Sequence, residues 1–389
     1  MIICMTPGEK THWLGEQARA QGFDLCGVAP TAGLAELGFL RGWLANGYAG
    51  DMKYLYDERR ADPQLVLEGA RSLIAVALNY NTAQPRTLHA QTANRTADEP
   101  PRGWISRYAW GDDYHDIMRE KLNRIVDAMR AQFAEPFESR AYVDTGPIVE
   151  RVAAKNAGLG WLAKNTCLIN QRLGSWLFLG VIVTTLDLEY SIPASEAPPR
   201  DLCGKCTRCL DACPTDAFPQ PYVLDSRQCI SYLTIELREA IPETLRAAMG
   251  SATVGCDICQ DVCPWNHKAP ITAVPAFQPR RFGGTNMQLD DEAEKSLLEP
   301  SLEWLASLTQ EEFSRVFRKS AAKRAKWRGL VRNACVALGN AALADGSPAR
   351  ERVLRLLENL ASSSDSLIAE HATWALQRQM SSASRDRVG

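Results

Sequence analysis

The sequence lacks the long apolar runs of a membrane protein and has no excess of charge of either sign. Its best apolar candidate, residues 176–186, is about half the roughly 20 residues that a helix needs to cross a bilayer, so we expect a buried strand there. The N-terminus has no basic segment followed by an apolar stretch, which predicts no secretory signal and a cytoplasmic location. With 44 basic and 46 acidic residues the net charge is −2, so any polyanion site must be a local patch.

The composition is that of an ordinary globular protein. Apolar residues make up 46% and charged residues 23%, which excludes wholesale disorder, a collagen-like repeat and a coiled-coil rod. A length of 389 residues suggests two or three domains. In the first half, strand and helix patterns alternate, which indicates an α/β layered domain. The predicted strands are 24–28, 72–78, 140–144 and 174–186, and the predicted helices are 11–21, 33–46, 112–132 and 149–157.

Two proline-rich segments, 191–201 and 269–281, flank a stretch that is rich in cysteine. From about residue 287 the pattern is helical, with a weak repeat that relates Ala334 to Ala372, 38 residues later. This offset is close to the period of HEAT-type helical repeats. We therefore expect an α/β domain over 1–190, a cysteine-rich module over 191–281 and a HEAT-like helical domain over 282–389.

Eight of the twelve cysteines lie in the cysteine-rich stretch, a density that in a reducing compartment favours metal binding over disulfides. The first four follow the spacing Cys-x2-Cys-x2-Cys-x3-Cys-Pro of bacterial ferredoxins: Cys203, Cys206, Cys209 and Cys213. A second, shorter motif ends in Cys-Pro and needs one more ligand, which Cys229 can supply. We expect two 4Fe–4S clusters, with the following ligands. One set is Cys203, Cys206, Cys209 and Cys263; the other is Cys213, Cys229, Cys256 and Cys259.

Structural zinc is the alternative use of paired cysteines. It does not explain a run of three cysteines and two Cys-Pro endings, so the ferredoxin interpretation is preferred. Four cysteines have no partner at ligand spacing, and we expect small buried hydrophobes there. They are Cys4, Cys26, Cys167 and Cys335. Two clusters only carry single electrons, so another part of the chain must use them.

Asp144 is the candidate for that chemistry. It stands at the end of a predicted strand, in the segment YVDTGPIVER at 142–151, just before a turn and a helix. In α/β proteins this edge of the sheet binds ligands. On position alone, an Asp144 that caps the following helix is the slightly favoured interpretation.

The motifs resemble one known family closely. They are YVDTGPIVERVAAKNAGLGWLAKNTCLIN, GSWLFLG, CGKCTRCLDACPTDAF, CISYLTIE and CDICQDVCPWN, with RYAWGDDYHDIMREKL and DERRADP nearer the N-terminus. In order and spacing they resemble epoxyqueuosine reductase over nearly the whole chain. The tail after about residue 290 is the least specific part.

The resemblance implies an oxidoreductase that deoxygenates epoxyqueuosine to queuosine at the wobble position of tRNA, using two electrons. It implies a nitroreductase-like cobalamin domain, a ferredoxin-like module with two 4Fe–4S clusters, and Asp144 as a proton donor held protonated in a dry pocket. The implied partners are tRNAs with GUN anticodons (Tyr, His, Asn and Asp) and an external electron donor such as a flavodoxin or ferredoxin system. We expect a monomer without a membrane partner.

Cobalamin rests on the resemblance alone. The Asp-x-His-x-x-Gly motif that supplies a histidine to cobalt begins at Asp113 and His115 but has Met118 in place of glycine. The missing histidine fits base-off cobalamin without a protein ligand, which is the form that the resemblance implies, and it equally fits a protein without cobalamin. We predict that Asp113 and His115 form the exposed start of a helix. The predicted cofactor contacts, each of which is otherwise an ordinary surface residue, are Arg60, Tyr108, Asp144, Lys164, Asn165 and Ser175.

A basic segment provides the expected tRNA contact. Eight Lys or Arg residues and no acidic ones lie between Arg315 and Arg332, a pattern that can hold phosphates. We expect Lys323, Arg324 and Lys326 to bind the tRNA. The alternative is a solvated helix face, and the spacing spreads these residues over more than one face.

Two other functions fit part of the sequence. A reductive dehalogenase would share cobalamin and two clusters, but the sequence lacks a twin-arginine export signal and has a basic helical C-terminus. A simple electron carrier would need neither the large N-terminal domain nor the basic segment.

Overall fold

The computed structural model describes residues 5–84, 99–281 and 296–385. Its N-terminal half is built on a four-stranded sheet with the order β1-β2-β7-β4, in which every neighbouring pair is antiparallel. The strands are β1 (Leu25–Pro30), β2 (Ser72–Asn79), β7 (Leu177–Thr184) and β4 (Ser139–Tyr142). The central strand β2 is buried along its whole length, as its continuous apolar run predicted.

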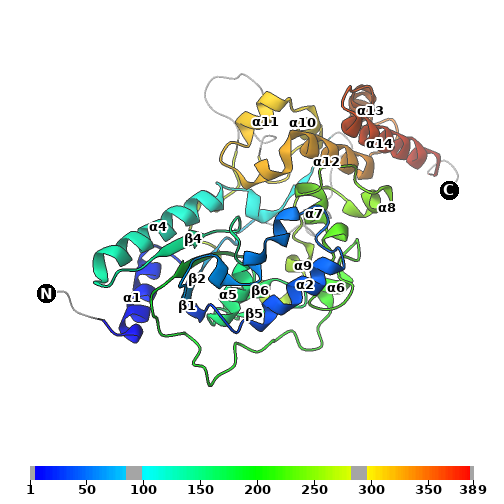
Figure 1. Cartoon of the computed structure of the whole chain (residues 1–389). Helices are drawn as coiled ribbons and strands as arrows, with labels where there is room; N and C mark the ends of the chain where they lie inside the picture. Colours follow the sequence, from blue (N-terminus) through cyan, green and yellow to red (C-terminus); the bar gives the residue numbers. More distant parts are fainter. Residues whose placement is uncertain (1–4, 85–98, 282–295, 386–389) are drawn as a thin grey trace.

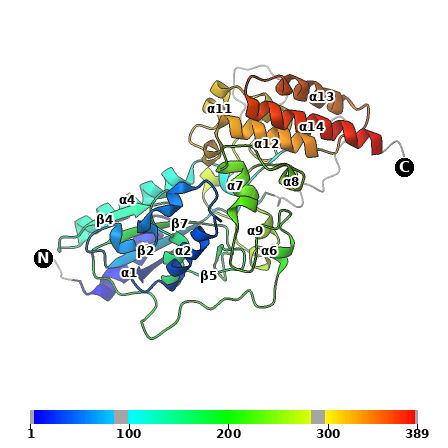
Figure 2. The same ribbon diagram turned by 45° about the vertical axis from the view of Figure 1, so that its right-hand side comes forward.

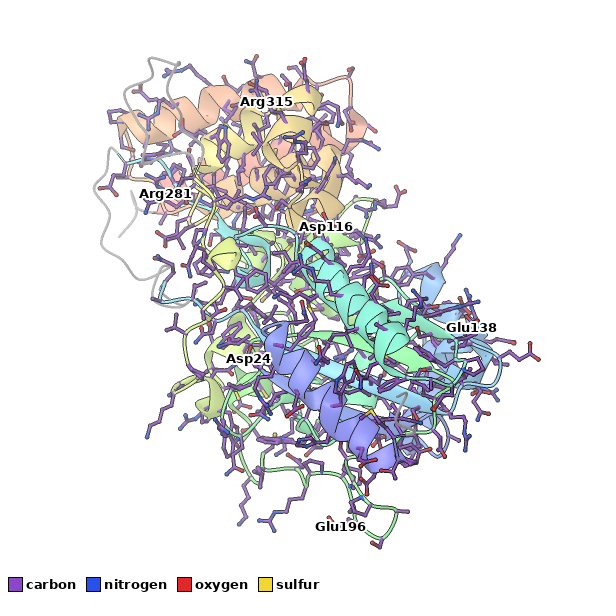
Figure 3. The ribbon with its side chains drawn as sticks, turned by 90° about the vertical axis from the view of Figure 1, so that its left-hand side faces the viewer. Asp24, Asp116, Glu138, Glu196, Arg281 and Arg315 are labelled. Carbon is purple, nitrogen blue, oxygen red and sulfur yellow. The ribbon has the colours of Figure 1, made fainter. Side chains whose placement is uncertain are left out.

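Helices cover both faces of this sheet and give three layers (Figure 1). α1 (Pro7–Ala20) and α4 (Tyr114–Gln132) lie side by side on one face (Figure 3), and α5 (Glu150–Asn156) covers the other. α4 forms where apolar residues recur at helical spacing, and its buried stripe includes Met118, Leu122 and Ile125. Asp113 caps its N-terminus by accepting a hydrogen bond from the backbone N–H of His115.

The predicted strands and helices of this half are present, with two differences. The helix expected over 33–46 is shorter, because the 3₁₀ turn η1 (Ala35–Leu37) precedes α2 (Gly38–Ala45). The sheet is antiparallel, so Asp144 does not lie on the shared carboxyl edge of parallel strands, and its position needs a local explanation. The remaining short elements here are η2 (Lys53–Tyr56), η3 (Glu58–Arg60), η4 (Pro63–Leu65), η5 (Arg107–Ala109), β5 (Trp161–Leu162) and β6 (Leu168–Ile169).

The cysteine-rich module follows and is joined to the first half through a small parallel sheet. In this sheet β3 (Trp104–Ile105) pairs with β8 (Ala252–Val254). Just after β8, the buried carboxylate of Asp257 accepts hydrogen bonds from the backbone N–H of Arg107 (2.8 Å) and the indole of Trp104 (3.2 Å). The other elements of the module are α6 (Arg208–Asp211), η6 (Ser226–Gln228), α7 (Ile230–Ile235), α8 (Glu243–Arg246), η7 (Ala247–Met249), α9 (Ile258–Asp261), η8 (Pro264–Asn266) and η9 (Pro275–Phe277).

The described C-terminal residues are helical, as predicted, and α14 lies at the opposite end of the molecule from α1 (Figure 2). The elements are α10 (Leu302–Ser307), α11 (Gln310–Val316), η10 (Ala321–Ala325), α12 (Lys326–Asn340), α13 (Pro348–Ala361) and α14 (Ser366–Arg385). α12 is almost wholly buried, because α10 and α14 pack on it from one side and α7 and β8 from the other. The two alanines of the weak repeat, Ala334 and Ala372, are both fully buried on these packed helices. The predicted start of this region at 282 lies outside the described residues.

No helix in the described part of the chain is long and apolar enough to cross a membrane.

Candidate active site and cysteine groups

Asp144 stands two residues after β4 in a strained backbone conformation. Its φ is +56°, a left-handed value that aspartate tolerates better than most residues. Gly146 helps to set this turn, since a Cβ there would lie 2.2 Å from the Cδ1 atom of Tyr142. Asp144 does not cap α5: the N-cap position of that helix is Val149, which makes no side-chain cap. The helix-capping alternative is therefore wrong, and capping does not explain the positive φ of Asp144.

The first two residues of α4 contact the Asp144 carboxylate. The hydroxyl of Tyr114 donates a hydrogen bond to it (2.8 Å), and His115 Nε2 lies 3.5 Å from it. His115 Nδ1 in turn lies 2.7 Å from the carboxylate of Asp113. The three rings of His115, Tyr114 and Phe178 stack in sequence, with centroids 4.0 and 4.1 Å apart. The predicted helix start is confirmed, but the prediction that His115 is exposed is wrong, because stacking leaves its side chain only 20% exposed.

Two carboxylates determine the charge of His115. Burial alone would lower its pKa, but hydrogen bonds to Asp113 and Asp144 raise the pKa of His115 to about 9. For Asp144, burial acts to raise the pKa, and the hydrogen bonds from His115 and Tyr114 outweigh it, so the pKa is lowered. Near neutral pH the site therefore holds an imidazolium beside a carboxylate. The lowered pKa favours the carboxylate form of Asp144 over the protonated form that was expected, and its side chain is 66% exposed in this structure.

A second carboxyl lies beside Asp144. Glu150 is the first residue of α5, and burial, followed by the negative charge of Asp144, raises the pKa of Glu150 to about 7. Among the described residues its Oε1 atom is buried without a hydrogen-bond partner. The property expected of Asp144, a carboxyl that is easily protonated, thus belongs to Glu150. Sequence reasoning missed it, and its place in the segment YVDTGPIVER was the one available signal.

Arg60 and Tyr108 border the same site. Arg60, 9% exposed, donates to the backbone oxygens of Tyr54 (3.2 Å) and Ile148 (3.4 Å), so it joins η2 to the loop that carries Asp144. Burial and then the charge of Asp144 raise the pKa of Tyr108, whose ring lies edge-on to Tyr114 at 6.3 Å.

Tyr108 also touches the cysteine-rich module, at Gly255. A Cβ on Gly255, whose φ is +71°, would lie 2.6 Å from the Cβ of Ser106 and 3.1 Å from the Tyr108 ring. Tyr108 therefore connects Asp144 to the segment that carries Cys256.

The other three predicted cofactor contacts are bonded to the module. The ammonium of Lys164 donates to the carbonyls of Gly204 (2.7 Å) and Cys206 (3.0 Å). Asn165 donates to the carbonyl of Cys259 (3.3 Å), and the hydroxyl of Ser175 donates to Gln260 (2.8 Å). All three side chains are buried. Their observed task is to fix the cysteine loops against the N-terminal half.

The cysteines of the module form two groups of thiols, and no cysteine described is in a disulfide. In the first group, Cys209 interacts electrostatically with Cys263, Cys203 and Cys206. In the second, Cys256 interacts with Cys229 and Cys213, and Cys259 interacts with Cys256 and Cys229. These interactions are compatible with the two ligand sets expected from the sequence, and the assignment of ligands to each cluster stays a prediction.

The spacing of the thiols can be compared with the needs of zinc and of a cubane cluster. Within the ranges that the structure describes, no three His, Cys, Asp or Glu side chains converge as the ligands of a single ion would. Tetrahedral zinc draws its ligands to one centre. A cubane cluster instead has four separate irons, each with its own thiolate, so its ligands stand farther apart.

The expectation of a small buried hydrophobe is right for Cys335, which is buried, while Cys26 is only partly buried against the core. Burial raises the pKa of both thiols to about 12. Cys167 differs, because its thiol contacts Cys259 of the second group. Cys4 lies outside the described residues.

The basic segment divides into buried and exposed residues. Arg332 is fully buried and donates to the carbonyls of Leu233, Leu237 and Glu239, so its expected place in an RNA-facing patch is wrong. The residues that are exposed are Arg315, Arg318, Lys319, Lys323, Arg324, Lys326 and Arg328. The segment borders the site, because the backbone N–H of Asp113 donates to the carbonyl of Lys319 (3.0 Å).

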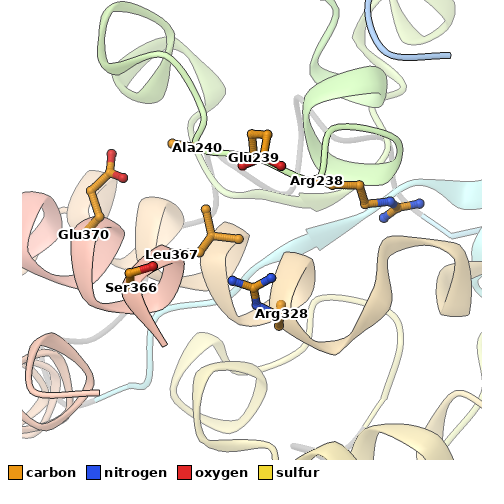
Figure 4. A pocket seen from close by; sticks show the side chains of 7 residues that line it. All are labelled: Arg238, Glu239, Ala240, Arg328, Ser366, Leu367 and Glu370. Atoms are coloured by element: carbon orange, nitrogen blue, oxygen red, sulfur yellow. The ribbon is translucent and has the colours of Figure 1, made fainter. Parts of the chain in front are cut away.

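Two hollows lie between this segment and the module. One, of about 160 Å³, is shown in Figure 4, and its lining includes Arg238, Arg328 and Glu370. Arg328 is engaged in an ion pair with Asp365, and Arg238 donates to the carbonyl of Arg324 (3.1 Å). The second hollow, of about 240 Å³, is lined in part by Lys326 and Trp327.

Comparisons with known proteins agree with this arrangement. Residues 202–266 match the 4Fe-4S double cluster binding domain, so the chain carries a module for two 4Fe–4S clusters. Residues 60–145 match the family described as Epoxyqueuosine reductase QueG.

Relatives match over most of the chain. The epoxyqueuosine reductase of Pseudomonas aeruginosa is 35% identical over 374 residues, which cover 96% of this chain and 95% of the relative. A crystal structure of epoxyqueuosine reductase with an epoxyqueuosine-modified tRNA-Tyr stem loop is 30% identical and has a TM-score of 0.79, covering 95% and 89% of the two chains. A Bacillus subtilis structure, in which the catalytic aspartate loop is swung out of the active site, is 27% identical with a TM-score of 0.74, covering 94% and 98%. This chain belongs to the epoxyqueuosine reductase family.

Proposed function

We propose that this chain is an oxidoreductase that reduces epoxyqueuosine in tRNA to queuosine. The proposal is carried by the position of Asp144 next to a two-cluster module in a chain of this family. Asp144 is exposed and has a positive φ, and its carboxylate contacts Tyr114 and His115. The related structure holds a tRNA stem loop carrying the same modified base. The reductive dehalogenase and electron-carrier alternatives have no comparable support.

The reaction consumes two electrons and two protons. Both carbon–oxygen bonds of the epoxide break, a carbon–carbon double bond forms, and the oxygen leaves as water. We assign Asp144 to the delivery of a proton to the departing oxygen, with His115 as the group that holds the proton beforehand. The exposed carboxylate and its two donors support this assignment. The related structure with a swung-out catalytic aspartate loop supports it as well.

The thiols suit the clusters in number, grouping and chemistry. One cluster would be held by Cys203, Cys206, Cys209 and Cys263, and the other by Cys213, Cys229, Cys256 and Cys259. Lys164 and Asn165 would stabilise both loops through the carbonyls they already bind. An external donor such as a flavodoxin or ferredoxin system would supply the electrons.

The residues around Asp144 also fit a cobalamin. The Tyr108 hydroxyl, the Asp144 carboxylate and the unpaired Oε1 of Glu150 offer donors and acceptors for the amides that fringe a corrin ring. Arg60 would hold the loop that carries Asp144, while Lys164, Asn165 and Ser175 would act where the N-terminal half meets the module. When bound, cobalamin would pass the two electrons from the clusters to the epoxide, and its electronics would be tuned by these neighbours.

Several finer expectations extend this proposal. The chain would divide at about residues 190 and 281 into a nitroreductase-like cobalamin domain, a ferredoxin-like module and a HEAT-like helical domain. The two matched segments, 60–145 and 202–266, lie inside the first two. Its substrates would be tRNAs with GUN anticodons for Tyr, His, Asn and Asp, contacted by Lys323, Arg324 and Lys326. The protein would act as a monomer, and a cytoplasmic location stays a prediction.

A single-turnover assay tests the function. Protein loaded with iron, sulfide and cobalamin is mixed with a stem loop carrying epoxyqueuosine and excess reductant, and the nucleosides are identified by mass. Conversion to queuosine, with the loss of one oxygen, is expected. An unchanged substrate under conditions in which both clusters are reduced would contradict the proposal.

A further inference from the structure

We propose that Tyr54, with the guanidinium groups of Arg60 and Arg324, forms a stacking platform for a nucleobase of the tRNA loop next to the reacting nucleotide. The inference rests on the proposed function, because it takes tRNA as the partner. It adds a recognition element in the N-terminal half, apart from the lysines of the basic segment.

Tyr54 has the exposure and the neighbours that such a platform needs. Its side chain, on η2, is 45% exposed. The guanidinium of Arg60 lies 5.5 Å from the ring centroid and that of Arg324 lies 5.7 Å from it. Its hydroxyl makes no hydrogen bond to any residue that the structure describes, and the contacts given for its ring are those with the two guanidinium groups. Cationic neighbours at these distances favour an electron-rich aromatic face.

Three parts of the chain hold this group in place. Arg60 is fixed by the backbone oxygens of Tyr54 and Ile148. Arg324, from the C-terminal helices, forms a two-point ion pair with Glu236 of the module (2.8 and 2.9 Å). A side chain held on several sides has less conformational entropy to lose on binding. The platform is therefore ordered before a ligand arrives.

The platform lies beside Asp144. The charges of Glu236, Arg324, Asp144 and Arg60 all act on the Tyr54 hydroxyl, and Asp144 also acts on Arg324. A nucleotide that reaches Asp144 must leave the stack of the RNA loop, which exposes the faces of its neighbours. Proteins that bind unstacked RNA cover such faces with aromatic rings and arginine planes. The neighbouring Lys323 and Lys326 are exposed and suited to the phosphates.

The test measures the affinity of stem loops at one fixed salt concentration. Tyr54→Ala should weaken binding by about 5- to 150-fold, the range expected for the loss of one stacked base. Tyr54→Phe keeps the ring and should bind like the wild type. Phe39→Ala, which removes a 79% exposed aromatic from α2, is the matched control and should leave affinity unchanged.

Abasic stem loops identify the stacked nucleotide. Removing that one base should weaken binding to the wild type but cause no further loss in Tyr54→Ala, because the base and ring act as a pair. Additive losses at every loop position, or unchanged affinity of Tyr54→Ala, would overturn the proposal. Loss of bound cobalamin from Tyr54→Ala with normal RNA affinity would instead assign the ring to the corrin. Binding is measured without turnover, so a wild type that binds but fails to convert substrate would contradict the proposed function alone.

Discussion

At the scale of single residues, the pair formed by His115 and Asp144 decides where the proton is held. The pKa of His115 is raised to about 9 and that of Asp144 is lowered, so the imidazolium keeps the proton until the carboxylate can pass it on. Asp144 has a positive φ and does not cap α5, and its carboxylate contacts Tyr114 and His115 of α4 instead. The strain is thus located at the residue to which we assign proton delivery.

Replacing Asp144 with asparagine removes the acid and preserves its shape. We expect Asp144→Asn to lose about 10²-fold or more in single-turnover conversion, the scale of a lost general acid. Asparagine accepts the Tyr114 hydrogen bond and tolerates a positive φ, so folding, iron content and stem-loop affinity should match the wild type. Near-normal conversion by this variant would exclude Asp144 from proton delivery.

The pH dependence of conversion follows from His115. Because its pKa is raised above its ordinary value, the imidazolium persists at neutral pH and is lost as the pH rises through about 9. The wild-type rate should therefore fall above about pH 9, and His115→Gln should be slow at every pH. The charged groups facing His115 are Asp113 and Asp144. Glu150→Gln, which removes the group that titrates near 7, serves as the control and should keep the alkaline fall.

Among the elements, those with a continuous pattern could be predicted and those that depend on distant partners could not. β2 lies where a continuous apolar run predicted a strand, and α4 lies where apolar residues at helical spacing predicted a helix. The antiparallel order of the sheet and the pairing of β3 with β8 join segments far apart in the chain, and periodicity carries no information on such pairing. In the site, the local cysteine spacing indicated a two-cluster module, which the match of residues 202–266 supports, whereas each expected ligand set combines cysteines from both motifs and stays a prediction.

The charge-bearing residues of the site were harder to predict. The sequence suggested that His115 is exposed at the start of a helix. In the structure Tyr114 stacks on His115, and Phe178 of β7 stacks on Tyr114. This contact with a distant strand could not be predicted from the local sequence. Arg332 seemed to belong to a basic surface, but the carbonyls it binds come from the module about 95 residues earlier. Burial of a charge is possible only where such partners exist, and a single sequence does not reveal them.

Gly255 gives a test of the junction between elements. An alanine at position 255 would have to adopt a φ of +71°, which is unfavourable for a residue with a side chain. Its Cβ would also lie 2.6 Å from the Cβ of Ser106. To avoid this clash, the end of β8 must move away from the turn that carries Tyr108. We expect Gly255→Ala to hold about four irons in place of eight, since the displaced segment carries Cys256. Iron and sulfide analysis after anaerobic reconstitution measures this. Gly329→Ala, on α12 with no neighbour closer than 4.0 Å, is the control and should retain all the iron.

At the scale of the whole molecule, three parts of the chain meet at the site. The N-terminal half supplies Asp144 and Arg60, the module supplies the thiols and Glu236, and the C-terminal helices supply Arg324. A net charge near zero leaves no long-range attraction to RNA, so the exposed basic segment must provide it locally. The basic residues of this segment are not equally available to RNA, because Arg324 forms an ion pair with Glu236 and Arg332 is buried.

The difference in availability among these basic residues leads to a prediction for RNA binding. Lys323 and Lys326 are exposed and form no ion pair with the described residues, whereas Arg324 is paired with Glu236. If both lysines contact phosphates, the variant Lys323→Ala with Lys326→Ala should reduce the slope of log affinity against log salt by about 1.4, at ~0.7 for each single-strand contact. The loss should be similar for all substrate tRNAs, since phosphate contacts carry no sequence information.

The control for this prediction changes basic residues that the site does not need. Arg355 and Arg378 lie on α13 and α14, and replacing both with alanine should leave the salt slope unchanged if binding is local to the basic segment. Equal effects of the two double variants would show that RNA responds to total charge, and the segment would lose its special role. A full effect of the lysine pair alone would place the phosphates beside the platform of Tyr54. In that position the lysines hold the backbone, the ring holds a base, and the reacting nucleotide is left free to reach Asp144.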